Sequence, residues 1–314
     1  MGRGGWAGAL RGRLFCATAS GAGGGGMGRR WVWAGVVFLG VALALGVSDR
    51  DRSKTLTIGL TPWSSTTPSA YVAKVLLEER GYQVSFLEAD VGVIFAGLAR
   101  GDVDLFTDAW LPTLHKSYME RYGDRVEVVG TVYRQADLGW VVPGYVPVNS
   151  LAELAGQEAA FDIDGDGRGE IVGIDPGAGM MAVSREVLAT YGLDGYELVE
   201  GSEFAMLTEL SRALKREGWI CVLAWSPHWI FAAYDLKYLE DPKGLWQKDD
   251  VRVLTRRGLA EEAPQAVALL RDFQISIDDM NRMILAIEVE DQDPEEVARA
   301  WVEAHRPEVD RWGR

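Results

Sequence analysis

Apolar and polar positions alternate along the chain with two periods, which predicts strands and helices in turn. Residues 54–60 have the two-residue period of a half-buried strand, and 68–80 carry one apolar helical stripe that ends at Gly81. Further strands are expected at 82–87, 103–106, 126–133, 139–142, 171–174, 196–199 and 220–224. Further helices are expected at 93–100, 180–191, 203–216, 264–273, 277–288 and 294–305. This order predicts an α/β fold in which helices cover the faces of parallel sheets.

The beginning of the chain has a different pattern. Residues 1–30 contain arginine but no acidic residue, and the uncharged apolar run 31–47 follows. A basic segment before an apolar run is typical of an export signal, and a run of this length is close to the shortest that can span a membrane. We therefore expect 1–50 to be a cleaved signal peptide or a membrane anchor. The rest of the chain is then expected in the periplasm or at the outer face of the cytoplasmic membrane.

Charge and cysteine content exclude several classes of function. The net charge is −14, whereas nucleic-acid binding needs a basic surface. The two cysteines are Cys16, within the leader, and Cys221, within an apolar run that reads as a buried strand. We therefore expect no internal disulfide and no thiolate metal site in the exported part.

Four of the 12 tryptophans lie in short turn-like motifs that follow or end an apolar run. They are Trp63 in Leu-Thr-Pro-Trp-Ser-Ser, Trp110 in Thr-Asp-Ala-Trp-Leu-Pro, Trp140 in Leu-Gly-Trp-Val-Val-Pro and Trp225 in Ala-Trp-Ser-Pro-His-Trp. Any one of them could simply pack in the core. Together, several indole faces around one cavity would make a cage for a weakly hydrated cation such as a quaternary ammonium group.

Several longer motifs, in order, resemble those of the glycine betaine, proline betaine and choline-binding proteins of ABC importers. They include Gly-Asp-Val-Asp-Leu-Phe-Thr-Asp-Ala-Trp-Leu-Pro, Gly-Ile-Asp-Pro-Gly-Ala-Gly-Met-Met, Ser-Glu-Phe-Ala-Met-Leu and Trp-Ser-Pro-His-Trp, and the resemblance covers about 54–305. It implies a two-lobed periplasmic-binding-protein fold, each lobe a mostly parallel sheet flanked by helices. By that resemblance, lobe one comprises 54–138 plus 232–314, and lobe two comprises 139–231.

The resemblance also implies which residues hold the ligand. A box of aromatic rings would enclose the trimethylammonium group, and by motif its members are Trp63, Trp110, Trp140 and Trp225. Family members differ at the third position, and Tyr133 could take its place. No salt bridge is needed, because the methyl groups shield the cationic nitrogen.

The carboxylate of a betaine would need a second set of contacts. Gly177, Ala178 and Gly179 lead into the helix expected near residue 180, where free backbone N–H groups attract anions. His228 is near a tryptophan motif and could donate a hydrogen bond to the carboxylate, or could be a loop histidine satisfied by its own surroundings.

The sequence leaves the roles of two aspartates undecided and places one more histidine. Asp108 and Asp175 could accept a hydrogen bond from a ligand hydroxyl, as choline would need, or could cap turns. His115 stands five residues after Trp110 in an amphipathic stretch and is expected at the surface.

The segment 162–170 resembles a calcium loop. Asp162, Asp164, Asp166 and Glu170 occupy relative positions 1, 3, 5 and 9, but Gly173 stands where the loop usually has its bidentate glutamate. The alternative is a tight turn rich in aspartate and glycine. Apart from this possible Ca²⁺ site, no cofactor is expected.

These features favour a non-catalytic receptor that captures a quaternary-ammonium osmolyte, with glycine betaine the first choice, by closure of two lobes. The receptor is expected to be a monomer that delivers its ligand to an ABC permease. The alternatives are a choline- or carnitine-specific binding protein, or a membrane-anchored quaternary-amine sensor. An exported hydrolase or lyase is disfavoured, because the chain has neither a Gly-x-Ser-x-Gly nor a His-Glu-x-x-His motif and has only three histidines.

Overall fold

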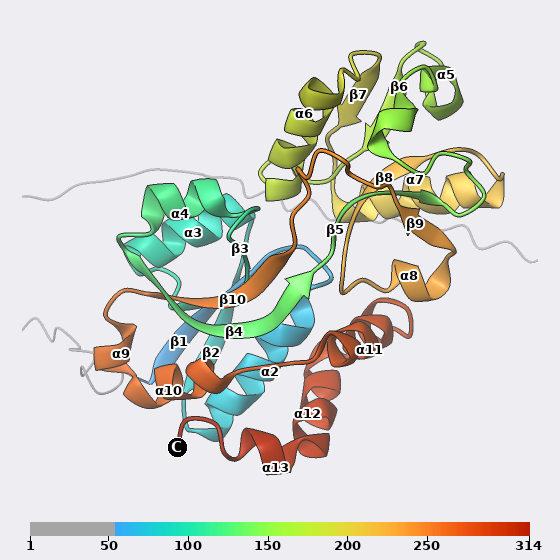
Figure 1. Ribbon diagram of the computed structural model, residues 1–314. Coiled ribbons are helices and arrows are strands. Elements are labelled where there is room, and N and C mark those ends of the chain that lie inside the picture. The colour runs from blue at the N-terminus through green and yellow to red at the C-terminus, as the bar shows by residue number, and fades with distance from the viewer. Residues whose placement is uncertain (1–53) are drawn as a thin grey trace, which may run out of the picture. The chain divides into compact units, whose positions relative to one another are not determined.

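The computed structural model describes residues 54–314, and within them the strands form two five-stranded sheets (Figure 1). The strands of the first sheet are β1 (Thr55–Leu60), β2 (Gln83–Glu88), β3 (Leu105–Leu111), β4 (Val126–Ala136) and β10 (Asp249–Arg256). Those of the second sheet are β5 (Leu138–Pro143), β6 (Gly169–Val172), β7 (Tyr196–Val199), β8 (Cys221–Trp225) and β9 (Leu236–Tyr238). The spatial orders are β2-β1-β3-β10-β4 and β7-β6-β8-β5-β9.

Each sheet combines two parallel strand pairings with two antiparallel ones. In the first sheet β1 runs parallel to β2 and β3, whereas β10 runs antiparallel to β3 and β4. In the second, β6 runs parallel to β7 and β8, whereas β5 is antiparallel to β8 and β9. The predicted α/β class is confirmed. The pairing is more mixed than expected, because β5 and β10 each run against the other strands of their sheet. The sequence pattern did not predict β9 or β10.

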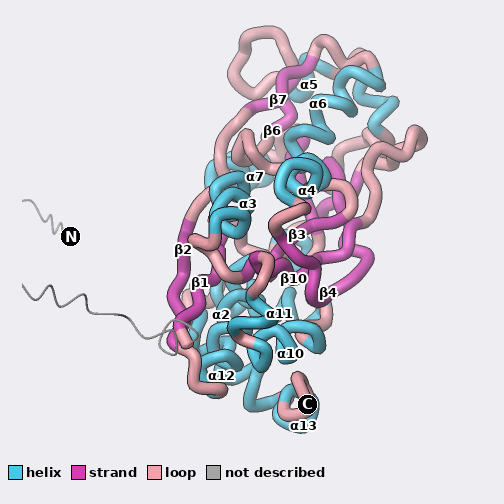
Figure 2. Tube along the Cα trace, turned by 90° about the vertical axis from the view of Figure 1, so that its left-hand side faces the viewer, coloured by secondary structure: helices cyan, strands magenta, loops and turns pink. Residues whose placement is uncertain are grey.

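Helices cover both faces of the first sheet. Those nearest to it in sequence are α2 (Thr66–Glu79), α3 (Val91–Arg100) and α4 (Lys116–Tyr122). Helix α2 packs on β1, β2 and β3, whereas α3 contacts α4 and β10, and Figure 2 shows α2 and α3 on opposite sides of the strands. Helix α3 ends at Gly101, whose φ of +83° is the left-handed conformation that favours glycine at this position.

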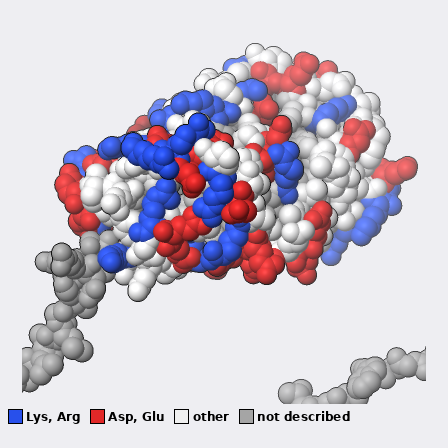
Figure 3. Space-filling model, turned by 90° about the horizontal axis from the view of Figure 1, so that it is seen from below, with Lys and Arg blue, Asp and Glu red and all other residues white. Residues whose placement is uncertain are grey.

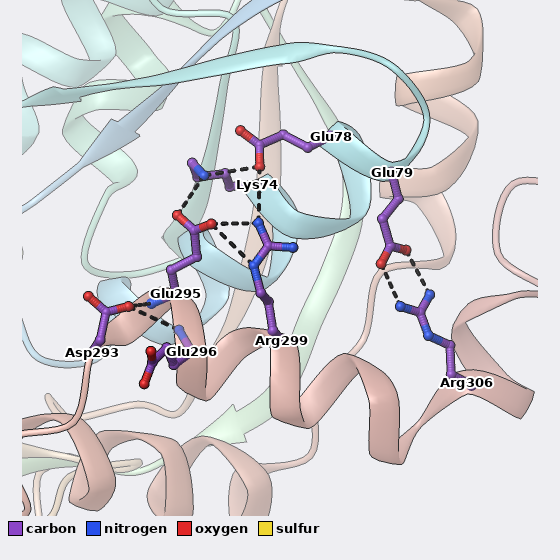
Figure 4. A network of polar contacts seen from close by, with 8 residues as sticks. All are labelled: Lys74, Glu78, Glu79, Asp293, Glu295, Glu296, Arg299 and Arg306. Carbon is purple, nitrogen blue, oxygen red and sulfur yellow. Dashed lines mark hydrogen bonds and ion pairs between the residues drawn. The ribbon is translucent and has the colours of Figure 1, made fainter.

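The C-terminal helices complete the same half of the molecule. They are α9 (Leu259–Glu262), α10 (Pro264–Asp272), α11 (Ile277–Glu288), α12 (Pro294–Ala304) and α13 (Arg306–Val309). Ion pairs join α12 and α13 to α2, as Figure 4 shows: Lys74 lies 2.8 Å from Glu295, and Arg306 lies 2.5 Å from Glu79. On the face seen in Figure 3, basic and acidic side chains are interspersed, which is typical of a solvated surface.

The second sheet carries its own helices. They are α5 (Glu158–Phe161), α6 (Gly179–Tyr191), α7 (Glu203–Lys215) and α8 (Ile230–Ala233), with a 3₁₀ turn at Leu151–Leu154. We call the first sheet with α2–α4 and α9–α13 the first lobe, and the second sheet with α5–α8 the second lobe. Helix α6 contacts β7 and α5 contacts β6, and Cys221 is a buried free thiol in β8, as the sequence predicted.

The chain passes between the lobes twice, after β4 and after β9. The expected boundary at 231/232 is too early, because β9 pairs with β5 across Val141 and Tyr238 and so belongs to the second sheet. The predicted signal peptide or anchor at 1–50 lies outside the described residues. Within 54–314, no helix combines the length and apolar character needed to cross a membrane.

Candidate functional site

A narrow cavity, with room of about 20 Å³ for water-sized spheres, is lined by residues from both lobes. Its lining residues are Trp63, Ser65, Trp110, Leu114, His115, Leu138, Ile174, Ala178, Gly179, Met180 and Trp225. Most of the lining is apolar or aromatic, as is typical of small-molecule sites.

Three of the four expected tryptophans lie around this cavity. Trp63 follows β1, Trp110 lies in β3, and Trp225 is the last residue of β8. Trp110 was expected just beyond a strand, but β3 continues to Leu111 because Trp110 pairs with Val251 of β10. All three side chains line the cavity and are buried, so their rings have little contact with bulk water.

Trp140 is a correction to the expected set. Its side chain is fully buried within the second lobe, and its indole Nε1 donates a hydrogen bond to Ser184 Oγ at 2.8 Å. Tyr133, the expected substitute, is outside the lining too and packs edge-to-face on Trp110 with the ring centroids 6.2 Å apart. Trp140 is therefore a core residue, and Tyr133 supports a cavity ring from behind.

Asp108 fixes the ring of Trp110 and does not line the cavity. It is buried, and its carboxylate accepts hydrogen bonds from Trp110 Nε1 at 3.0 Å and from Thr66 Oγ1 at 2.6 Å. Burial raises the pKa of Asp108 to about 6, although these hydrogen bonds favour its charged form. The structure therefore favours a role for Asp108 in holding neighbouring side chains of the protein, rather than in accepting a hydrogen bond from a ligand hydroxyl.

His115 is a lining residue that the sequence misplaced at the surface. Its Nδ1 accepts a hydrogen bond from the backbone N–H of Trp110 at 3.0 Å, and its ring stacks on Trp63 with the centroids 6.2 Å apart. Burial lowers the pKa of His115 to about 3, so the imidazole is neutral at physiological pH. A neutral ring here does not repel a cation in the cavity.

The N-terminus of α6 forms another part of the lining. Ala178 caps this 13-residue helix in an extended conformation and Gly179 is its first residue. The first N–H groups of a helix have no acceptor within the helix and attract anions. Gly177 is not in the lining, and its carbonyl accepts a hydrogen bond from Tyr118 of the first lobe at 2.8 Å.

Gly179 also touches the opposite lobe. A Cβ atom built on Gly179 would overlap the backbone carbonyl oxygen of Leu114. Because backbone atoms cannot rotate out of the way, only glycine fits here when the lobes are in contact.

His228 is placed differently from the role expected for it. It is outside the cavity lining, and its ring packs behind Trp225 with the centroids 4.9 Å apart. Its Nε2 lies 3.2 Å from Glu203 Oε1, and both side chains are buried. The structure therefore places His228 next to a carboxylate of the protein itself.

The cavity carries no formal charge. None of the described residues that line it is acidic, lysine or arginine, and its one histidine is neutral. Such a site cannot bind a cation through a salt bridge at its surface. It can bind one through the indole faces, which attract a cation most strongly when water is excluded.

The four acidic residues of the predicted calcium loop do come together. One ligand oxygen from each of Asp162, Asp164, Asp166 and Glu170 lies within 4.8 Å of the others. Asp162 also accepts hydrogen bonds from the backbone N–H groups of Gly165 and Gly167, as a tight turn would. Glu170 is buried, which raises the pKa of its carboxyl above the usual range.

Comparison with known proteins places the chain in a family. Residues 54–304 match the model of the substrate-binding domain of ABC-type glycine betaine transport systems. The chain belongs to this family. Its members are transport proteins and not enzymes, and they need no cofactor.

Individual relatives agree with this assignment. The chain is 34% identical over 162 residues to a glycine betaine/carnitine transport binding protein of Listeria monocytogenes, GbuC, and the match covers 51% of this chain and about half (54%) of that protein. A closed lactococcal OpuAC in complex with glycine betaine is 36% identical, with a TM-score of 0.77, 83% of this chain and 100% of that chain covered. A glycine betaine/L-proline-binding protein, ProX, of Borrelia burgdorferi is 33% identical, with a TM-score of 0.78 over 82% and 96% of the two chains.

Proposed function

We propose that the protein captures glycine betaine outside the cytoplasm and delivers it to an ABC permease. The observation that carries this proposal is the uncharged cavity between the lobes, with Trp63, Trp110 and Trp225 in its lining. Three indole faces, in a lining that contains no carboxylate, suit a cation that carries methyl groups and has no N–H to donate.

The ligand is oriented by the difference between the two parts of the cavity. The trimethylammonium group lies among the three indoles, and the carboxylate points to the N-terminus of α6, at Ala178 and Gly179. Choline has no carboxylate and would use only the first of these parts, which is why a choline-specific protein is the second candidate. Carnitine, which is longer, would need additional room beyond α6.

Closure of the lobes would complete the site. Residues of the first lobe and residues of the second lobe contribute to one cavity, so neither lobe alone can enclose the ligand. A ligand that contacts both lobes favours the closed state through its differential affinity, and the permease can then distinguish loaded protein from empty protein. Export through the leader and action as a monomer are part of the same proposal.

A series of amines that differ only in methyl groups tests the cage. We expect titration calorimetry to show affinity falling at least tenfold from glycine betaine to dimethylglycine, and falling again for sarcosine and glycine. Each lost methyl group removes contact with an indole, at roughly 0.5–2 kcal/mol per ring, and exposes an N–H that prefers water. Equal affinity along the series would contradict a desolvated cage.

We further propose that the acidic loop binds Ca²⁺ as a structural ion. The oxygens of Asp162, Asp164, Asp166 and Glu170 match the hard ligands that Ca²⁺ prefers. A bound ion stabilises only the folded state, so the melting temperature should be higher in millimolar Ca²⁺ than in EDTA. The difference should disappear in an Asp166→Asn variant and persist in Asp194→Asn. An identical melting temperature of the wild-type protein in Ca²⁺ and EDTA would leave the loop as a tight turn.

A further inference from the structure

Two adjacent residues of the first lobe are hydrogen-bonded to two carboxylates of the second lobe. Trp63 Nε1 donates to Asp175 Oδ2 at 3.0 Å, and the backbone N–H of Ser64 donates to Glu203 Oε2 at 3.0 Å. Asp175 lies in the loop between β6 and α6, and Glu203 is the first residue of α7. Both bonds therefore join the lobes and contribute to the fold of neither.

The same residues are part of the cavity. Trp63 is one of its three indoles, and the carboxylate that holds its N–H fixes the plane of that ring. Glu203 is connected to a second indole, because its Oε1 lies 3.2 Å from His228, whose ring packs on Trp225. A change in the separation of the lobes would thus move two of the three rings that face the ligand.

Burial gives the Glu203 contact its strength. Glu203 is 5% exposed and Ser64 is 6% exposed, so the hydrogen bond is shielded from water. A hydrogen bond to an ionised group is stronger than one between neutral groups, and a buried carboxylate that loses a donor is costly to leave unpaired. A further hydrogen bond between the lobes, from Tyr118 to Gly177, is exposed and is expected to contribute less.

We propose that Asp175 and Glu203 are positioning residues that set how long the loaded protein stays closed. This inference rests on the proposed function, since it assigns a role in retention of the same ligand. Asp175 acts on the ring of Trp63 and Glu203 on the backbone next to it. Neither is among the residues that line the cavity, so both act through residues that do.

Dissociation kinetics test this role. We expect Asp175→Ala and Glu203→Gln each to raise the dissociation rate of glycine betaine at least tenfold, measured by stopped-flow tryptophan fluorescence, with a smaller change in the association rate. The matched control is Glu200→Gln, whose carboxylate pairs with Arg185 at 2.6 Å within the second lobe. It should dissociate at the wild-type rate.

Two further readouts separate positioning from a structural role. The melting temperature of the ligand-free Asp175→Ala protein should equal that of the wild type, because the bond forms only between the lobes. In a Gly179→Ala background, which prevents close contact of the lobes, Asp175→Ala should weaken binding no further. A lower melting temperature without ligand, full additivity, or a wild-type dissociation rate would each overturn the role of Asp175. A wild-type protein that binds no methylated amine would instead overturn the proposed function.

Discussion

Replacing Trp225 with alanine is expected to weaken glycine betaine binding at least tenfold, and Trp110→Ala is expected to do the same. Each ring contributes roughly 0.5–2 kcal/mol of cation–π energy when the cation is desolvated, and the alanine also removes apolar contact with the methyl groups. About 1.4 kcal/mol corresponds to a tenfold change in affinity. Phenylalanine should be tolerated better, because it keeps a π face. Titration calorimetry of each purified variant measures the effect.

The structure offers a matched control for the loss of an indole. Trp140 is a buried tryptophan of the same lobe as Trp225, outside the cavity lining and bonded to Ser184. Trp140→Phe should lower the free energy of unfolding, because Ser184 loses its donor, while the affinity for glycine betaine stays near that of the wild type. Wild-type affinity in both Trp110→Ala and Trp225→Ala would remove the cage.

The second large effect is expected from a single methyl group at Gly179. A Cβ there would overlap the carbonyl oxygen of Leu114 across the lobe contact, so Gly179→Ala should hold the lobes apart. We expect glycine betaine affinity to fall a hundredfold or more, because the ligand then keeps its contacts to one lobe only. Small-angle scattering should show no compaction when the ligand is added.

Gly177→Ala is the control for this substitution. A Cβ at Gly177 would meet Tyr118 Oη at 3.5 Å, which is an ordinary contact, so this variant should still close and bind. Gly179→Ala should fold with a wild-type melting temperature in the absence of ligand, since alanine favours the helix that begins there. Ligand-dependent compaction in Gly179→Ala would show that the lobes close without this contact.

Most elements of the fold follow from periodicity in the sequence. The helices α2, α6, α7 and α11 begin and end within two residues of the expected positions, because each has an apolar stripe. Strand β10 was not predicted. Its charged ends, Asp249 and Arg256, are typical of a surface segment. Asp249 is nevertheless buried, and its carboxylate accepts hydrogen bonds from the backbone N–H groups of Thr113 and Leu114.

The candidate site was predictable in part, since the motifs identified three indoles that line one cavity. Trp140 could not be distinguished from them, because successive residues of a strand point to opposite faces and the sequence does not say which face meets the cavity. His115 was misplaced for a related reason. The turn after β3 folds back so that His115 lies beneath Trp110, and only the tertiary contact buries it.

A crystal structure of the protein with glycine betaine tests the central claim most directly. We predict that the quaternary nitrogen lies over the faces of Trp63, Trp110 and Trp225, with the ligand carboxylate directed to the N-terminus of α6. A quaternary nitrogen paired with a carboxylate, or a ligand bound outside the cavity between the lobes, would contradict the account.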